Sequence, residues 1–179
     1  MLTKLALAVV LAAAATPTQV EHWTAAGAQV VQRGHGYCWT GSLAVARPDA
    51  WRCFLGKNEI EDPCFSGAGS YVTCPDGTPD SHDALRLQLT KPLPRSQTNP
   101  PGDPTRRPPW VIVTTGGAYC YRVTGATDER AGRALTYECA GASALAGSPN
   151  RTRPVWTVNL LPTATSKHYV TTAVRSAWW

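Results

Sequence analysis

Short stretches in which apolar and polar residues alternate dominate the chain, and the clearest of them lies at residues 84–90. Leu85, Leu87 and Leu89 fall on one face and polar residues on the other, which is the period of a half-buried strand. Other stretches rich in aromatic and β-branched residues follow between Gly/Pro turns, and no stretch after residue 15 shows a helical period. The pattern predicts an all-β protein of about ten short strands.

Two cysteine hairpins organise these strands. In the first, Tyr37-Cys38-Trp39 is followed by Trp51-Arg52-Cys53, and in the second, Tyr119-Cys120-Tyr121 is followed by Tyr137-Glu138-Cys139. The first cysteines of the two hairpins are 82 residues apart and the second cysteines are 86 apart. We therefore predict two similar small β lobes, residues 29–90 and 110–179, and raise the hypothesis of an internal duplication.

The segments outside the lobes have compositions of their own. Lys4 is followed by an apolar run from Leu5 to Ala15 that ends in small residues, which predicts a removed signal peptide over residues 1–15. The run is shorter than the roughly 20 residues that span a bilayer. We expect a secreted protein with no transmembrane segment in the mature chain, and a flexible lead over residues 16–28.

Residues 91–109 contain seven prolines in nineteen positions, with Ser, Asn, Asp and Gly between them. Proline lacks a backbone donor, so this stretch is neither a helix nor a central strand. It predicts a semi-rigid Pro-rich linker that joins the two lobes.

All six cysteines follow the predicted signal peptide, so an oxidising compartment is expected to hold them as disulfides. The hairpin pattern pairs Cys38 with Cys53 and Cys120 with Cys139, which leaves Cys64 with Cys74. No Cys-x-x-Cys pair or nearby histidine favours zinc instead.

The formal net charge is +5, and it falls to +4 when the predicted signal peptide and its Lys4 are removed. This mild excess favours an anionic cell-envelope polymer or glycan as partner, although an ordinary solvated surface explains it as well. No run of five like charges occurs, so a nucleic-acid partner is not predicted.

Aromatic residues beside the cysteines are the candidate binding residues. The candidates are Trp39, Trp51, Arg52, Tyr121 and Tyr137. A residue next to an inward-facing cystine points to the opposite face of its strand. Two interpretations are open: a glycan-stacking platform, or the interface between the lobes, which is the simpler of the two.

Acidic residues provide the only candidates for catalysis. Glu59, Glu61 and Asp62 offer neighbouring carboxylates of the type that cleave glycosides. A second acidic group, Asp76, Asp80 and Asp83, resembles calcium ligands, but an ordinary loop is the favoured interpretation. No metalloprotease, nucleophile-elbow or phosphate-binding motif is present, so we assign no catalytic residue, metal or cofactor.

Part of the sequence resembles a known group of proteins, which indicates the kind of organism that the protein comes from but not its activity. A group of secreted actinobacterial cysteine-containing proteins of unknown function is similar to this sequence in three segments: Gly36–Ser42, Arg47–Cys53 and Asp62–Phe65. The resemblance is strongest over residues 36–65. The resemblance implies an exported bacterial protein and brings no activity or catalytic residue.

From the sequence we expect a non-catalytic binding module that acts outside the cell, on an envelope component or an extracellular polymer. Two alternatives stay open. The first is a secreted hydrolase that uses the acidic residues near Glu59–Asp62, and the second is an inhibitor of a secreted enzyme.

Overall fold

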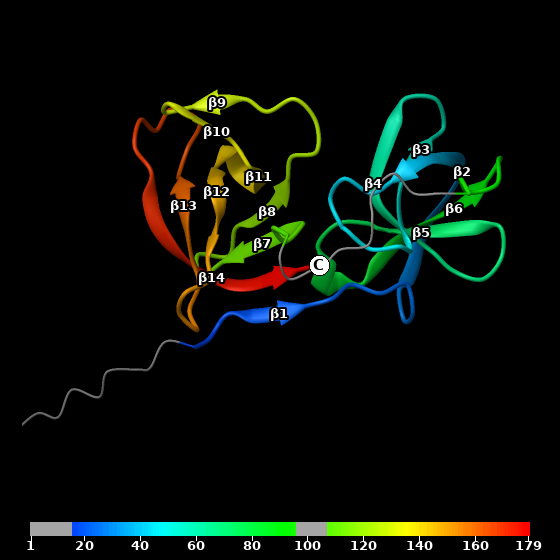
Figure 1. The fold of residues 1–179 in the computed structure, drawn as a ribbon, viewed down its shortest axis with the longest axis horizontal. Coiled ribbons are helices and arrows are strands. Elements are labelled where there is room, and N and C mark those ends of the chain that lie inside the picture. Colours follow the sequence, from blue (N-terminus) through cyan, green and yellow to red (C-terminus); the bar gives the residue numbers. More distant parts are fainter. Residues whose placement is uncertain (1–15, 96–106) are drawn as a thin grey trace, which may run out of the picture.

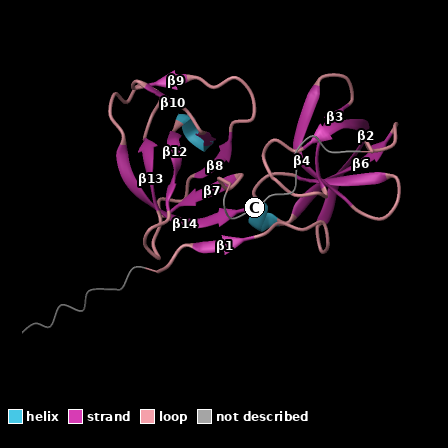
Figure 2. Cartoon of the chain, viewed as in Figure 1, coloured by secondary structure: helices cyan, strands magenta, loops and turns pink. Residues whose placement is uncertain are grey.

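The computed structural model describes residues 16–95 and 107–179. The predicted signal peptide (1–15) and the centre of the predicted linker (96–106) lie outside the described residues. Within the described residues the chain is all-β, as the alternation predicts, and it forms two barrel-like sheets (Figures 1 and 2). The Pro-rich linker remains a prediction.

Five strands close the first barrel in the order β2-β3-β4-β5-β6. The elements of this part of the chain are β2 Gln29–Gly41, β3 Ala50–Leu55, β4 Glu59–Ser66, β5 Tyr71–Pro75, the 3-10 turn η1 Pro79–Ser81 and β6 Asp83–Leu89. The 13-residue β2 pairs with β6 along its first half, in parallel, and with β3 along its second half. One long strand therefore both begins and closes the barrel.

Six strands close the second barrel in the order β14-β13-β12-β11-β8-β7, with β7 pairing back to β14. Their bounds are β7 Val111–Thr114, β8 Tyr119–Arg122, β11 Tyr137–Cys139, β12 Ala144–Asn150, β13 Thr157–Leu161 and β14 Val170–Trp178. The small hairpin β9 Glu129–Arg130 with β10 Arg133–Ala134 and the 3-10 turn η3 Ala140–Ala142 complete this lobe.

Glycine residues allow β2 to pair with both β6 and β3. A Cβ at Gly36 would lie 1.8 Å from the backbone oxygen of Phe54 on β3, and one at Gly34 would lie 2.4 Å from the Leu55 side chain. No larger residue fits at Gly36, where β2 leaves β6 and joins β3.

Each barrel has a core of apolar side chains around its cystines. In the first, Leu85 and Leu87 of β6 point inward, as their alternation predicts, and pack with Val72 and Trp51. In the second, Ile112, Leu145 and Tyr137 are buried. The disulfides join Cys38 to Cys53, Cys64 to Cys74 and Cys120 to Cys139, the three pairs that the hairpin pattern predicts.

A third apolar cluster lies between the barrels. Trp23, which is fully buried, stacks on Phe65 of β4 with ring centroids 5.0 Å apart. Trp110 and Trp178 of the second barrel contribute to the same cluster. Because buried side chains from both sheets share this cluster, the two barrels pack as one body.

A polar network centred on Asp62 lies beside this cluster. Its carboxylate accepts hydrogen bonds from the Ser42 hydroxyl, from the backbone N–H of Leu43 (3.1 Å) and from that of Ala44 (3.5 Å). It also accepts one from the Arg52 guanidinium at 3.1 Å. The Asp62 network therefore fixes the loop after β2 against β3 and β4.

Two arginines extend the Asp62 network to the second barrel. Arg52 also donates to the hydroxyl and carbonyl oxygens of Thr124, at 3.0 and 3.3 Å. In the opposite direction, Arg122 donates to the carbonyls of Leu43 and Ala44 at 3.2 and 3.3 Å. These bonds orient one barrel relative to the other.

The lead that we expected to be flexible, residues 16–28, is structured. β1 Gln19–Glu21 pairs in parallel with the end of β14, and Trp23 fills the cluster between the barrels. The polar composition of residues 16–28 did not predict this structure. Backbone pairing and one buried tryptophan are enough to hold the segment in place.

The segment Glu59–Cys64 forms most of β4 although it contains Pro63. Asp62 and Pro63 fall where the pairing of β4 with β3 is interrupted, between Cys53–Glu61 and Trp51–Cys64. A proline is tolerated at such an irregularity because no ladder hydrogen bond is required of it.

The two barrels correspond in strand order from the cysteine hairpin to the last strand, but they close differently. The β2–β6 closure is parallel, whereas the β7–β14 closure is antiparallel because a turn separates β7 from β8. Within the described ranges, no helix is long and apolar enough to cross a membrane.

We expect Asp62→Ala to lower the free energy of unfolding by roughly 3 kcal/mol, because it removes the charged partner of Arg52 and the acceptor of the Ser42 hydroxyl and of the Leu43 backbone N–H. Urea denaturation measures this change. Asp128→Ala, which removes an exposed ion pair with Arg130, should cost no more than about 0.5 kcal/mol. Equal costs for the two variants would contradict a central role for Asp62.

Candidate functional site

A continuous row of contacting rings lies on the outside of the β2–β3 hairpin. The Trp39 ring lies on Phe54 with centroids 4.2 Å apart, and the Tyr37 ring meets the same Phe54 at 5.5 Å. We call Tyr37, Phe54 and Trp39 the aromatic row. Lys91 stands at one end of the row, 4.0 Å from the Tyr37 centroid, and Arg52 at the other, 5.8 Å from that of Trp39.

Strand pairing and a β-bulge build the aromatic row. Tyr37 and Phe54 are direct partners across β2 and β3, so their side chains leave the same face of the sheet. Trp39 is the extra residue of a bulge, because Cys38 pairs with Cys53 and Thr40 with Arg52. The bulge turns the Trp39 ring onto Phe54.

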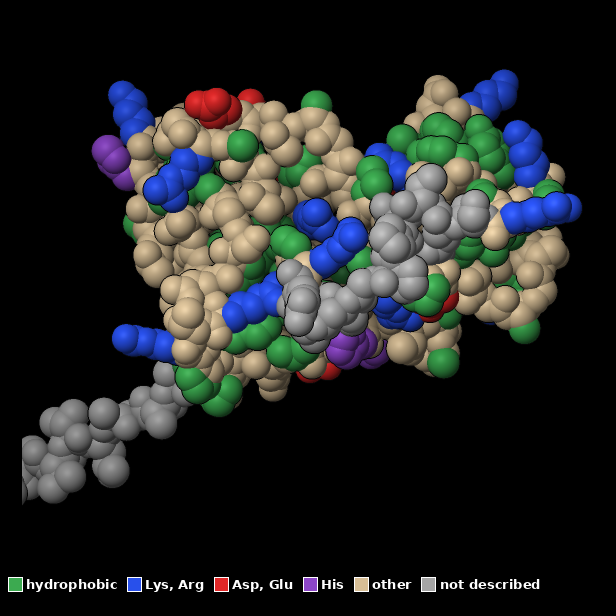
Figure 3. Space-filling view, viewed as in Figure 1, with side chains coloured by type: hydrophobic (Ala, Val, Ile, Leu, Met, Phe, Trp, Pro, Cys, Tyr) green, Lys and Arg blue, Asp and Glu red, His purple; other side chains and the backbone are tan. Residues whose placement is uncertain are grey.

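The aromatic row is partly open to solvent, since Tyr37 and Phe54 are half-buried and Trp39 is exposed. Trp39 is 37% exposed, and Ile60, the β4 partner of Phe54, is 45% exposed. Figure 3 shows hydrophobic side chains gathered on the upper part of the first barrel, with Lys and Arg side chains around them. An exposed apolar group of this kind, rimmed by charge, is typical of an interaction surface.

Of the five candidate binding residues, only Trp39 is solvent-exposed. Trp51 is 6% exposed and lies in the first core, and Tyr137 is fully buried and donates to the Pro109 carbonyl at 2.9 Å. Both precede a bridged cysteine by two residues, so alternation places them on the cysteine's own side of the strand. The expectation that a residue faces outward holds only for the immediate neighbours of an inward-facing cysteine. Trp51 and Tyr137 are therefore core residues.

Arg52 and Tyr121 lie at the interface between the barrels, which is the simpler of the two interpretations that the sequence left open. Arg52 is held by Asp62 and Thr124 as described above. Tyr121 packs against the cluster between the barrels and donates its hydroxyl to the Gly77 carbonyl at 2.9 Å. The immediate neighbours of the two hairpin cysteines therefore serve different purposes: Trp39 faces solvent and Tyr121 faces the first barrel.

A cavity of about 280 Å³ lies between the barrels, next to the candidate carboxylates. Its walls include Glu61, Asp62 and Asp76 together with the rings of Trp110 and Tyr121. Burial raises the pKa of Glu61, and the neighbouring charges of Glu59 and Asp76 raise it further. A carboxyl with a raised pKa beside aromatic walls has the properties of a general acid.

Asp62 differs from Glu61 because its oxygens are already occupied. Burial raises the pKa of Asp62, while hydrogen bonds from Ser42 and Leu43 and the charge of Arg52 lower it. With donors on both oxygens, this carboxylate positions the loop after β2 and has a structural role.

The other acidic group does not converge on a metal site. The Asp80 carboxylate accepts a hydrogen bond from the Tyr119 hydroxyl at 2.6 Å and so joins the barrels on another side. Within residues 16–95 and 107–179, no group of three or more His, Cys, Asp or Glu side chains could hold a metal ion.

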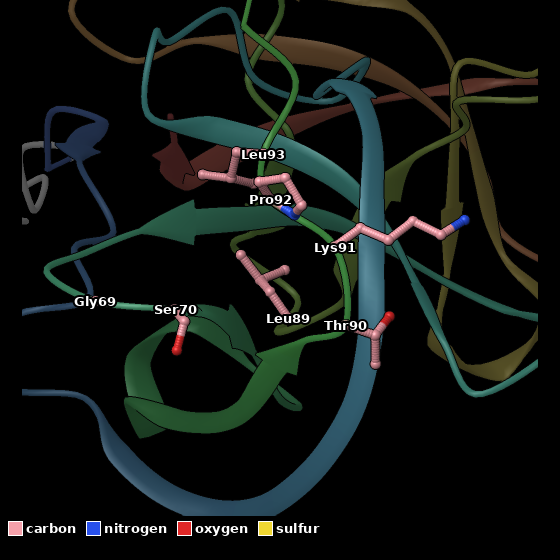
Figure 4. A pocket seen from close by; sticks show the side chains of 7 residues that line it. All are labelled: Gly69, Ser70, Leu89, Thr90, Lys91, Pro92 and Leu93. Atoms are coloured by element: carbon pink, nitrogen blue, oxygen red, sulfur yellow. The ribbon is translucent and has the colours of Figure 1, made fainter.

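A second hollow, of about 460 Å³, adjoins the end of the aromatic row. Leu89, Pro92 and Leu93 gather around it, with the backbone of Gly69 and Ser70 opposite, while the Lys91 side chain extends away (Figure 4). Its walls are apolar, and its one charged residue, Lys91, lies over Tyr37 instead. This hollow therefore provides contact surface and no catalytic group.

Tyr37, Phe54 and Lys91 complete the site but were not among the candidates. Tyr37 adjoins Cys38 just as Trp39 does, so the alternation argument could have included it. Phe54 and Lys91 become neighbours of Tyr37 only through the register of β3 and the path of the chain after β6.

No protein-family model, curated protein or solved structure matches this chain.

We expect Glu61→Gln to stabilise the protein at neutral pH. Because the folded state raises the pKa of Glu61, it keeps a proton that the unfolded chain has lost, so stability falls as the pH rises from the ordinary glutamate range through the raised value. The variant lacks this loss and should gain on the order of 0.5 kcal/mol at about pH 7, since solvent screens a partly exposed carboxylate.

At about pH 3, where both states are protonated, the gain should vanish. Urea denaturation at the two pH values tests this expectation, with Glu138→Gln on the exposed side of β11 as control. A gain that is the same at both pH values would contradict a titrating Glu61.

Proposed function

We propose that this protein is an exported, non-catalytic binding module that holds a glycan polymer of the cell envelope or extracellular space on the aromatic row. The observation that carries the proposal is the row of contacting rings Trp39, Phe54 and Tyr37 on one sheet face, with Trp39 exposed to solvent. The C–H faces of sugar rings pack on aromatic faces through dispersion and burial of apolar area.

The rigidity of the aromatic row favours binding. Phe54 is held by rings on both sides, and the strand beneath is fixed by the Cys38–Cys53 disulfide. A surface that is ordered before the ligand arrives loses little side-chain entropy on binding. A regular polymer can place successive rings along such a row.

Location outside the cell is part of the proposal. Three disulfides are compatible with an oxidising compartment, and the predicted signal peptide provides a route of export. The resemblance to secreted actinobacterial proteins makes a bacterial envelope the proposed setting. The formal charge of +5 favours an anionic target there.

The cavity between the barrels favours hydrolysis as a second candidate function. Glu61, with a raised pKa, lines the cavity between the barrels together with Asp76 and two aromatic rings. If the protein cleaves a glycan there, Glu61→Gln should abolish release of reducing ends from purified cell walls, while Glu138→Gln should not. No release by the wild-type protein would remove this candidate.

We expect Trp39→Ala to weaken binding to purified cell walls about tenfold, because it removes the exposed ring of the stack. Co-sedimentation with walls at increasing protein concentration measures the dissociation constant. Trp39→Tyr keeps a ring at this position and should retain most of the affinity.

The matched control is Val170→Ala, which truncates an exposed apolar side chain on the second barrel. It should bind as the wild type does. Wild-type protein that does not pellet with the walls, or Trp39→Ala that pellets equally well, would refute the proposal.

A further inference from the structure

Two arginines are paired directly across the β2–β6 closure of the first barrel. Arg33 of β2 and Arg86 of β6 are register partners. Arg86 lies between the inward-facing Leu85 and Leu87, so it faces outward. Partners in a parallel pair point to the same side, and their strands are about 4.8 Å apart. Like charges in this arrangement repel one another.

The described part of the chain contains no carboxylate that forms an ion pair with either arginine. Arg86 lies 4.6 Å from the Tyr71 ring centroid, and its buried Nε–H has no acceptor there. A bound anion would relieve the repulsion between the two guanidinium groups. Guanidinium groups suit this role because they hold carboxylate or phosphate oxygens through two parallel hydrogen bonds.

The arginine pair is continuous with the aromatic row. Along β2, the exposed His35 separates Arg33 from Tyr37, and Lys91 lies over Tyr37. From Arg33 to Trp39 the strand covers six residues, which is about 20 Å. The face therefore carries the arginine pair at one end and the rings at the other, over a length that suits a chain molecule better than a single small ligand.

We propose that the ligand of this face is an anionic glycan that lies along β2, with sugar rings on the aromatic row and an acid group between Arg33 and Arg86. Lys91 provides a further cation along the same path. This inference rests on the proposed function and adds the direction in which the glycan lies and the residues that recognise its acid group. An acid group on the glycan would neutralise the two neighbouring guanidinium groups.

The test compares two double variants that change the net charge equally. Arg33→Gln with Arg86→Gln removes the pair, while Arg153→Gln with Lys167→Gln removes two exposed cations of the second barrel. Co-sedimentation with purified cell walls at about 0.1 M salt limits long-range charge effects to about 10 Å. We expect about a tenfold loss of affinity for the first pair and little change for the second.

Two further arms keep the result interpretable. Arg33→Gln alone changes an exposed side chain and leaves the Arg86–Tyr71 contact intact, so it should fold normally and still lose part of the affinity. Walls whose carboxylates have been amidated, and walls stripped of phosphate, distinguish the two sources of acid groups. Wild-type binding should fall sharply on one of these preparations.

The two proposals fail in different ways. If Trp39→Ala weakens binding but the arginine variants match their control and both treated walls bind normally, the glycan is recognised without its charge and this inference is overturned. If the wild-type protein does not bind walls at all, the proposed function fails first. Loss of affinity in the arginine variants together with loss on one treated wall supports the anionic glycan.

Discussion

The buried carboxylate of Asp62 is the contact on which the arrangement of this protein depends. It fixes the loop after β2, and its partner Arg52 reaches both Thr124 of the second barrel and the Trp39 ring. A carboxylate with so little access to solvent is stable only when its hydrogen bonds are complete. One network therefore sets the orientation of the barrels and supports one end of the aromatic row.

The two cysteine hairpins share a construction but not a use. In the second barrel, Tyr121 beside Cys120 is covered by the first barrel, whereas Trp39 beside Cys38 stays in solvent. The difference follows from β2, whose glycines let it bend from β6 to β3 and whose bulge turns Trp39 onto Phe54. Packing of the barrels removes one aromatic surface and leaves the other free for a ligand.

Charge is distributed unevenly over this body. The cavity between the barrels is acidic, with Glu61 and Asp76 in its walls, whereas the outer face of β2 carries Arg33 and His35 and lies beside Lys91. This distribution of charge would repel the proposed anionic polymer from the cavity and attract it to β2. The same chain therefore keeps its two candidate regions chemically distinct.

Alternation and cysteine spacing are local properties of the chain, so the strand class, the inward face of β6 and the three disulfides could be predicted from the sequence. It could not determine which aromatic residues reach solvent. Trp51 and Tyr137 are buried by core packing, and Phe54 joins Tyr37 only through strand register. The lead at residues 16–28 became structural because Trp23 fills a space that exists only between two assembled barrels. Contacts between residues far apart in the chain depend on the closure of both sheets, which is why no local pattern in the sequence reveals them.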